Sequence, residues 1–197
     1  AHGLRVVGMK PLAAGAQLED GRLVNEDVAA LRRASTVIAA DELVNPYCFA
    51  QPIAPHIAAA LAGTSMDLDR VQGAFEALSR SADVVIVEGA GGFRVPLSDD
   101  FDTSHLAARL ALPVVLVVGM RLGCLNHALL TAAAIHASGL TLAGWVANHI
   151  DPDMAYAGEN VAALEKRLPA PLLGRLSYSA AWQAEDAARV LHIELLQ

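Results

Sequence analysis

The sequence contains little cysteine and no long hydrophobic run. Its 2 cysteines, Cys48 and Cys124, stand far apart and lack the paired spacing of a metal-binding motif. Neither a disulfide framework nor a cysteine-based metal site is therefore expected. No apolar run reaches the ~18–20 residues that a membrane span requires, and residues 1–11 hold no apolar core of the length found in secretory signal peptides. We expect a cytoplasmic protein that does not bind membranes.

Charge and aromatic residues are also scarce. Charged residues make up 18% of the 197 residues and aromatic residues 5%, whereas hydrophobic residues reach 54% and the mean hydropathy is +0.40. This composition excludes a disordered chain. The net charge of −7 argues against sequence-independent binding to nucleic acid. The length fits one folded domain, so we expect a single α/β domain over residues 1–197.

Short apolar runs dominate the sequence and predict strands. Four runs, at 4–12, 83–92, 113–120 and 142–150, are almost continuously apolar. Such runs are typical of strands that are covered on both faces, as in a parallel sheet. Two weaker strand candidates lie at 35–40 and 171–176.

Helical patterns separate these runs. They lie at 25–35, 66–82, 102–112, 126–139 and 155–168, and Asn25 is the expected N-cap of the first of them. Strands that alternate with helices at this spacing predict βαβ units. The expected fold is therefore α/β, with a doubly wound, mostly parallel sheet flanked by helices.

Ligands bind open parallel sheets beyond the carboxyl ends of the strands. Lys10 ends the first run, where an ammonium group can reach a phosphate or a carboxylate; a solvated surface lysine is the alternative. Glu88 ends the second run, where its carboxylate can hold Mg²⁺. The glycines that follow it, among them Gly89 and Gly91, allow a backbone to approach a phosphate closely. An ordinary glycine-rich turn is the alternative here.

Two further strand ends carry candidate residues. Gly123 lies in a turn that enters a helix, and the N-terminus of a helix attracts anions; simple capping by Asn126 is the alternative. Asn148 lies near the end of the run 142–150, where its amide can both donate to and accept from the edge of a nucleobase. Asparagine is also a common turn former, which is the alternative for this position.

In this order and at these spacings, the segments resemble dethiobiotin synthetases. The resemblance extends from about residue 3 to about residue 176. It rests on GMKPLAAG (8–15), NED (25–27), VNPYCFAQPIAPHIAA (44–59), VEGAGGF (87–93), PLSD (96–99), LPVVLVVGMRLGCLNHALLT (112–131), GLTLAGWVANHI (139–150) and PAPLLG (169–174). The segments at 44–59 and 122–131 are not generic features of phosphate-binding folds, and they make the resemblance specific.

The resemblance implies a phosphate-loop NTPase-like fold and an ATP- and Mg²⁺-dependent ligase of biotin biosynthesis. Members of this family join CO₂ to 7,8-diaminopelargonate. A carbamate forms on one amine, the ATP γ-phosphoryl group converts it to a carbamic-phosphoric anhydride, and the second amine closes the ring of dethiobiotin. The implied partners are these small molecules and a second copy of the chain in a homodimer, with no nucleic acid and no membrane.

The resemblance also assigns roles to individual residues. Lys10 matches the catalytic lysine, and Asp27 and Glu88 match the carboxylates around Mg²⁺ and the ATP phosphates. The remaining matches are Gly89, Ala90 and Gly91 beside the phosphates; Asn148, His149, Ser177, Tyr178 and Ser179 around adenine; Ala14, where the family commonly has a substrate-binding serine; and Gly123, Cys124, Leu125 and Asn126, which receive the substrate carboxylate across the dimer interface. At Ala14 the lost hydrogen bond is expected to raise KM, at a cost of ~0.5–1.5 kcal/mol.

One departure from the family pattern concerns the phosphate loop. The family begins with a strand, a GxxxxGKT-type loop and a helix, and no such segment precedes Lys10. The sequence thus predicts an N-terminally truncated member that lacks its first βα unit, binds ATP poorly and turns over little. Two alternatives stay open: a non-catalytic nucleotide-binding or regulatory module of the same fold, and an inactive remnant that only dimerises.

Overall fold

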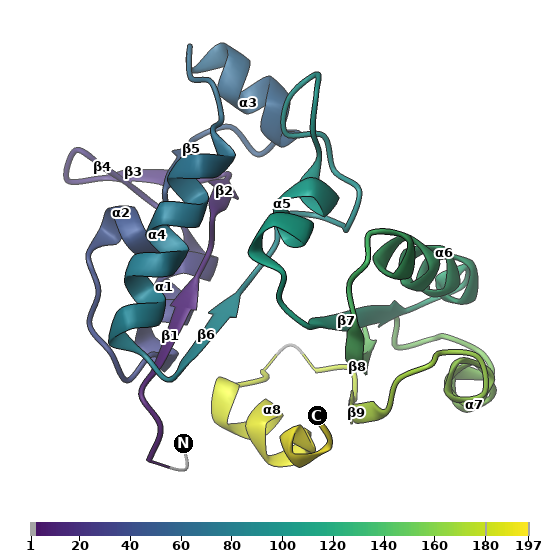
Figure 1. Ribbon diagram of the computed structural model, residues 1–197. Coiled ribbons are helices and arrows are strands. Elements are labelled where there is room, and N and C mark those ends of the chain that lie inside the picture. Colours follow the sequence, from purple (N-terminus) through teal and green to yellow (C-terminus); the bar gives the residue numbers. More distant parts are fainter. Residues whose placement is uncertain (1–2, 180, 197) are drawn as a thin grey trace. The chain divides into compact units, whose positions relative to one another are not determined.

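The computed structural model describes residues 3–179 and 181–196. Its contacts divide the chain into two compact units, one that ends at Leu110 and one that begins at Ala111 (Figure 1). Each unit has its own sheet structure and its own cluster of buried hydrophobic residues. In the described part of the chain, no helix is both long enough and apolar enough to cross a membrane.

The N-terminal unit holds the first half of the predicted alternation of strands and helices. Its strands are β1 (Val6–Met9), β2 (Leu12–Ala14), β3 (Gln17–Glu19), β4 (Arg22–Val24), β5 (Tyr47–Phe49) and β6 (Val84–Val87). Its helices are α1 (Glu26–Ala34), α2 (Asp41–Val44), α3 (Pro55–Leu61), α4 (Leu68–Ser81) and α5 (Thr103–Leu110). The strands β1 and β6 pair in parallel, which confirms the parallel pairing predicted from the apolar runs at 4–12 and 83–92. The strands β2 and β5 also pair in parallel, although the sequence predicts no strand at 47–49.

The predicted strand over 4–12 is interrupted. It forms two strands, because Pro11 has no N–H group for a sheet ladder and lies between β1 and β2. As a result β1 pairs with β6, whereas β2 pairs with β5 in a separate sheet. Lys10 is thereby placed at the break between two sheets.

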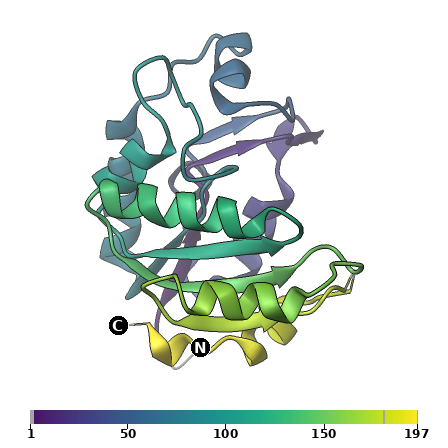
Figure 2. The same ribbon diagram turned by 90° about the vertical axis from the view of Figure 1, so that its right-hand side faces the viewer.

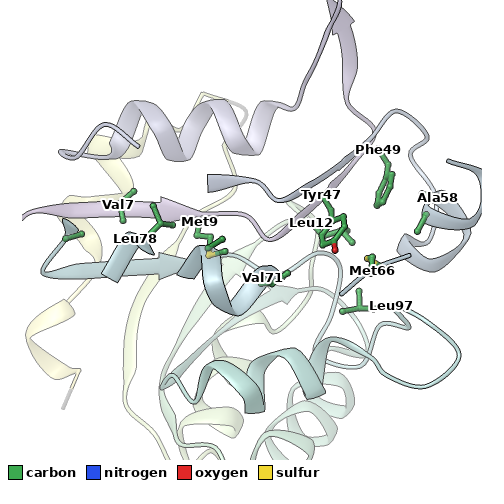
Figure 3. Packing of buried hydrophobic residues seen from close by; sticks show 13 residues of the cluster. Val7, Met9, Leu12, Tyr47, Phe49, Ala58, Met66, Val71, Leu78 and Leu97 are labelled. Carbon is green, nitrogen blue, oxygen red and sulfur yellow. The ribbon is translucent and has the colours of Figure 1, made fainter. Parts of the chain in front are cut away.

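The core of the N-terminal unit lies between the β1–β6 pair and helix α4. Val7 and Met9 of β1 and Leu78 of α4 are at most 1% exposed, and Figure 3 shows these side chains close together. Farther along, the rings of Tyr47 and Phe49 stack with their centroids 6.5 Å apart. This core fixes the strand ends from which the candidate site is built.

Helix α1 packs unusually close to strand β1, at Gly8. A Cβ atom at position 8 would lie 2.8 Å from the Cβ of Leu31 and 2.9 Å from its Cδ2. The Gly8 N–H also donates to the Ser35 hydroxyl at 2.9 Å. Glycine at this position therefore lets α1, which carries Asp27 in its first turn, approach the strand that leads into Lys10.

Gly8→Ala is expected to lower the free energy of unfolding by about 1–3 kcal/mol, because the added methyl group overpacks against Leu31. Urea unfolding of the variant measures this loss. Gly73→Ala in α4 is the matched control, since nothing lies within 4 Å of its Cβ position, and alanine in a helix interior stabilises by ~0.5–1 kcal/mol relative to glycine. Equal effects of the two substitutions would contradict the assigned packing.

The C-terminal unit is a three-stranded parallel sheet with helices on its faces. The strands are β7 (Val114–Met120), β8 (Leu142–His149) and β9 (Leu172–Leu176), in that spatial order. The helices are α6 (Cys124–Ala137), α7 (Ala157–Glu165) and α8 (Ala184–Val190), followed by a short 3₁₀ turn η1 (Ile193–Leu195). Helices α6 and α7 lie side by side on one face of the sheet (Figure 2). Trp145, Val161 and Leu164 are completely buried in its core.

Several predicted elements differ from the observed ones. Residues 35–40 form no strand; instead the N–H groups of Thr36 and Val37 bond to the Val6 carbonyl and close the end of α1 onto β1. The helix predicted from residue 126 begins at Cys124, where Gly123 with φ of +94° serves as N-cap, so Asn126 does not cap it. The weak candidate at 171–176 is confirmed as β9.

Candidate functional site in the N-terminal unit and candidate pocket in the C-terminal unit

Lys10 brings two acidic side chains together. Its ammonium Nζ donates to Asp27 Oδ2 at 2.8 Å and to Glu88 Oε1 at 2.6 Å. Lys10 is only 5% exposed, and a buried ammonium group requires such partners. The sequence prediction that an ammonium and two acids, remote in the chain, meet at one edge therefore agrees with the observed geometry.

Each of the two acids reaches Lys10 from a different element. Asp27 lies in the first turn of α1, whose N-cap Asn25 accepts at its side-chain oxygen from the N–H of Asp27 at 3.1 Å, as expected. Glu88 directly follows β6, and its N–H donates to the Met9 carbonyl at 2.8 Å, which continues the parallel pairing by one residue. Glu88 is thus held beside Lys10 by the register of the sheet.

The two carboxylates keep coordinating capacity beyond Lys10. Their side chains are 55% (Asp27) and 44% (Glu88) exposed, and each bonds Lys10 through one oxygen only. Oxygen donors of this kind suit Mg²⁺, which is usually held by one or two carboxylates together with water and substrate phosphates. Among the described residues, no group of three or more histidine, cysteine or acidic side chains gathers as a metal cage. The residues therefore fit a magnesium ion shared with a bound phosphate.

The glycine-rich segment after Glu88 is held in place by the start of α5. Thr103 accepts at its hydroxyl from the Val95 N–H at 2.9 Å and donates to the Phe93 carbonyl at 2.7 Å. Its own N–H donates to the Val95 carbonyl at 2.9 Å. Gly91 adopts φ of +77°, a left-handed conformation that favours glycine. The chain just after the predicted phosphate-flanking residues, Gly89 to Gly91, is thus tied at Phe93 and Val95 to the start of α5.

Asp102 organises this helix start. Its carboxylate accepts from the Ser104 N–H at 2.8 Å, the Ser104 hydroxyl at 2.5 Å and Arg94 Nε at 2.5 Å, and it lies 3.0 Å from His105 Nδ1. Burial alone would raise the pKa of Asp102, but the hydrogen bonds from Ser104, Arg94 and His105 outweigh it and hold the pKa well below its usual value.

Asp102→Asn is expected to lower the free energy of unfolding near neutral pH by about 1.5–3 kcal/mol, the usual range for hydrogen bonds to a charged group. Because the pKa is lowered on folding, this contribution is complete above pH 3.8, the ordinary value, and is lost as the pH falls through the lowered pKa. The difference between the two proteins in chemical unfolding should therefore shrink in acid. Asp99→Asn, at an exposed position, is the control; an effect of Asp102→Asn as small as this control's would contradict the assignment.

The C-terminal unit contains a separate cavity of about 250 Å³ where strands β8 and β9 end. It is lined by His149, Asp151, Pro152, Met154, Ala157, Arg175, Ser177 and Tyr178. Three residues predicted around adenine, His149, Ser177 and Tyr178, therefore share one pocket. Asn148 and Ser179, predicted for the same role, are not among the lining residues.

The remaining predicted residues occupy two places. Ala14 ends β2, and its carbonyl accepts from the side chain of Asn25 at 3.3 Å, so it lies next to the cap of α1. Gly123, Cys124, Leu125 and Asn126 form the start of α6 in the C-terminal unit, where Cys124 is 3% exposed and Asn126 faces solvent. Cys48 and Cys124 are both free thiols.

The fold and the comparisons define a class of protein. A family profile described as an AAA domain matches residues 1–186. A chain of the MinC:MinD cell division protein complex of Aquifex aeolicus aligns with a TM-score of 0.52 over 91% of this chain and 71% of that one; at 16% identity the likeness shows the fold alone. The sheets are mostly parallel and flanked by helices, and the family profile matches most of the chain. Together these findings identify a phosphate-loop NTPase-like α/β protein, as the sequence predicts.

Two curated relatives narrow this class to one family. The ATP-dependent dethiobiotin synthetase BioD of Aromatoleum aromaticum is 55% identical over 191 residues, which cover 97% of this chain and 85% of that protein. The enzyme of the same name from Nitrosospira multiformis is 54% identical over 193 residues, or 98% of this chain and 84% of that protein. The chain belongs to the dethiobiotin synthetase family, whose members are ATP-dependent ligases.

Proposed function

We propose that this protein closes the ureido ring of dethiobiotin from 7,8-diaminopelargonate, CO₂ and ATP, with Mg²⁺. The observation that carries the proposal is the Lys10 cluster, in which a buried ammonium group bonds to one oxygen each of two acids whose side chains are about half exposed. The family relationship supports the choice of substrates, because both curated relatives carry the name of this activity.

Lys10 is the catalytic residue in this proposal. One amine of the substrate adds to CO₂ and loses a proton, which gives a carbamate anion. The carbamate oxygen takes the γ-phosphoryl group of ATP and ADP leaves; the second amine then attacks the carbamate carbon and releases phosphate. Negative charge gathers on the carbamate and on the moving phosphoryl group, and a fixed ammonium group stabilises both.

Asp27 and Glu88 are the proposed metal ligands. A bound Mg²⁺ would neutralise part of the phosphate charge. One oxygen of each carboxylate already lies within 2.8 Å of the same Nζ atom. The hydrogen bonds therefore orient the lysine and the two metal-binding carboxylates relative to one another. Gly89, Ala90 and Gly91 follow Glu88 directly and offer a backbone that phosphate oxygens can approach.

The cavity at the ends of β8 and β9 is the proposed nucleobase site of the C-terminal unit. Its volume of about 250 Å³ suits one planar ring system, and Tyr178 offers an aromatic face while His149 and Ser177 offer polar atoms. We also propose that Gly123–Asn126 binds the substrate carboxylate in a homodimer. The exposed Leu122 (96%) and Leu130 (62%) on and beside α6 support a subunit interface at this helix.

Isotope-labelled bicarbonate tests the proposed reaction directly. The full-length protein, supplied with Mg-ATP, 7,8-diaminopelargonate and ¹³C-bicarbonate, is expected to form dethiobiotin with the label in its ureido carbon and one equivalent each of ADP and phosphate. Hydrolysis of ATP without formation of the C–N bonds would contradict the proposal and favour a regulatory module. A protein that dimerises but binds no nucleotide would favour an inactive remnant.

A further inference from the structure

Lys10 lies where the chain leaves one sheet and enters another. The hydrogen bonds between the strands therefore do not pair all of the backbone groups of Lys10. Strand β1 ends at Met9, β2 begins at Leu12, and Pro11 between them offers no N–H group. The Lys10 N–H donates to the Val44 carbonyl at 2.8 Å instead of to a neighbouring strand. The Lys10 carbonyl, which faces away from the β1–β6 pairing, needs a donor from elsewhere.

Asn45 supplies that donor. Its side-chain Nδ2 donates to the Lys10 carbonyl at 2.6 Å and to the Tyr47 carbonyl at 2.9 Å. The Tyr47 N–H in turn donates to the Pro11 carbonyl at 3.1 Å. Asn45 thus bridges the break between the two sheets, with one amide group bound to the backbone on both sides of it.

We propose that Asn45 is a positioning residue that fixes the backbone of Lys10 and thereby aims its ammonium group at the reacting phosphoryl group. This role rests on the proposed function of Lys10. Within the described residues, the side chain of Asn45 makes no hydrogen bond to Asp27 or Glu88; its two bonds go to backbone carbonyls. A small shift of a catalytic group caused by a residue outside the chemistry costs about 100-fold in rate.

The chemistry of the contact requires an amide rather than a side chain of the same shape. Both partners are carbonyl oxygens, so the group at position 45 must donate twice. An aspartate fills the same space but presents acceptors to acceptors. If Asn45 mattered only for packing, Asn45→Asp would be harmless and Asn45→Ala would be the damaging change.

A labelling experiment separates the position of Lys10 from catalysis. Lys166 is the only other lysine in this sequence and is exposed, so it serves as an internal reference for an amine-acylating reagent read out by peptide mass spectrometry. In the wild-type protein Lys10 is expected to react far more slowly than Lys166. In Asn45→Ala and Asn45→Asp, the Lys10 rate relative to Lys166 is expected to rise about tenfold or more, because the segment opens locally.

Steady-state kinetics provide the second measurement. Both variants are expected to lose about 100-fold in kcat while KM for Mg-ATP stays within about twofold, because the lost orientation acts in the transition state. Asn160→Ala is the matched control, since its amide also donates to a backbone carbonyl, that of Tyr156 at 2.9 Å, in the C-terminal unit. This control should change neither readout.

The two measurements test the positioning role and the proposed function separately. Lys10 labelling within twofold of wild type in Asn45→Asp would overturn the positioning role, whatever the activity. Increased labelling in a protein that forms no dethiobiotin even as wild type would support the structural hold of Asn45 on Lys10 but overturn the proposed function, and with it the role of that hold in catalysis. If neither variant yields soluble protein, Asn45→Ser, which keeps one hydroxyl donor, is measured against the same criterion.

Discussion

Lys10→Ala is expected to lower kcat for dethiobiotin formation by about 100- to 1,000-fold, the usual cost of removing one group that stabilises transition-state charge. The substitution removes the cation that bonds Asp27 and Glu88 at 2.8 and 2.6 Å. Because both carboxylates are about half exposed, water solvates them in the variant, so the protein should still fold. Circular dichroism and a kcat measurement at saturating substrates test the two expectations together.

Two further variants sharpen the result for Lys10. Lys10→Arg should not restore the activity, because the site is 5% exposed and a planar guanidinium group cannot take the place of a compact ammonium group there. Lys166→Ala removes the other lysine at an exposed position and should leave kcat unchanged. A Lys10→Ala protein with kcat within a factor of about three of wild type would remove Lys10 from the catalytic centre.

Glu88→Gln is expected to raise the Mg²⁺ concentration for half-maximal activity at least about tenfold, because it replaces an anionic ligand by a neutral amide. The amide keeps the size of the side chain and one oxygen that can still accept from Lys10. The loss should therefore appear in the metal dependence more than in the folding of the protein. Titration of activity with Mg²⁺ at fixed ATP measures it.

Glu76→Gln is the matched control for Glu88→Gln, because Glu76 is exposed on α4 and, within the described residues, its carboxylate accepts from Gln72 alone. Its Mg²⁺ titration should overlay that of the wild type. Identical Mg²⁺ titrations for Glu88→Gln and the wild type would show that the metal, if bound, is not held by this carboxylate, and would shift the assignment to Asp27 alone.

The sequence predicted the Lys10 cluster because each member lies at a position with a local signal. Lys10 and Glu88 end apolar runs, and such runs become neighbouring parallel strands whose carboxyl ends meet. Asp27 follows the N-cap Asn25 by two residues, which places it in a first helical turn. Only the resemblance to a family connected this turn with the two strand ends, because periodicity does not tell which helix packs against which strand.

Other residues near the site make contacts that no regular spacing in the sequence predicts. Asn45 donates to carbonyls 35 and 2 residues away, and no spacing rule predicts the first of these bonds. Asp102 is a different case: the sequence marks it as a candidate cap of the helix over 102–112, but its contact with Arg94 depends on how the intervening loop folds back. Pro11 interrupts one apolar run, but tertiary pairing decides which sheet each half of that run joins.

The hairpin β3–β4 has ends that are held in place and a tip that can change in length. It joins Ala14 to Asn25, two residues already held to each other at 3.3 Å, and all of its strand residues are exposed. Extra residues inserted at its tip, Asp20–Gly21, would lengthen a loop whose ends stay clamped, at an entropic cost that grows only slowly with length. This turn is therefore the natural place to attach a reporter group without disturbing the clamped residues Ala14 and Asn25.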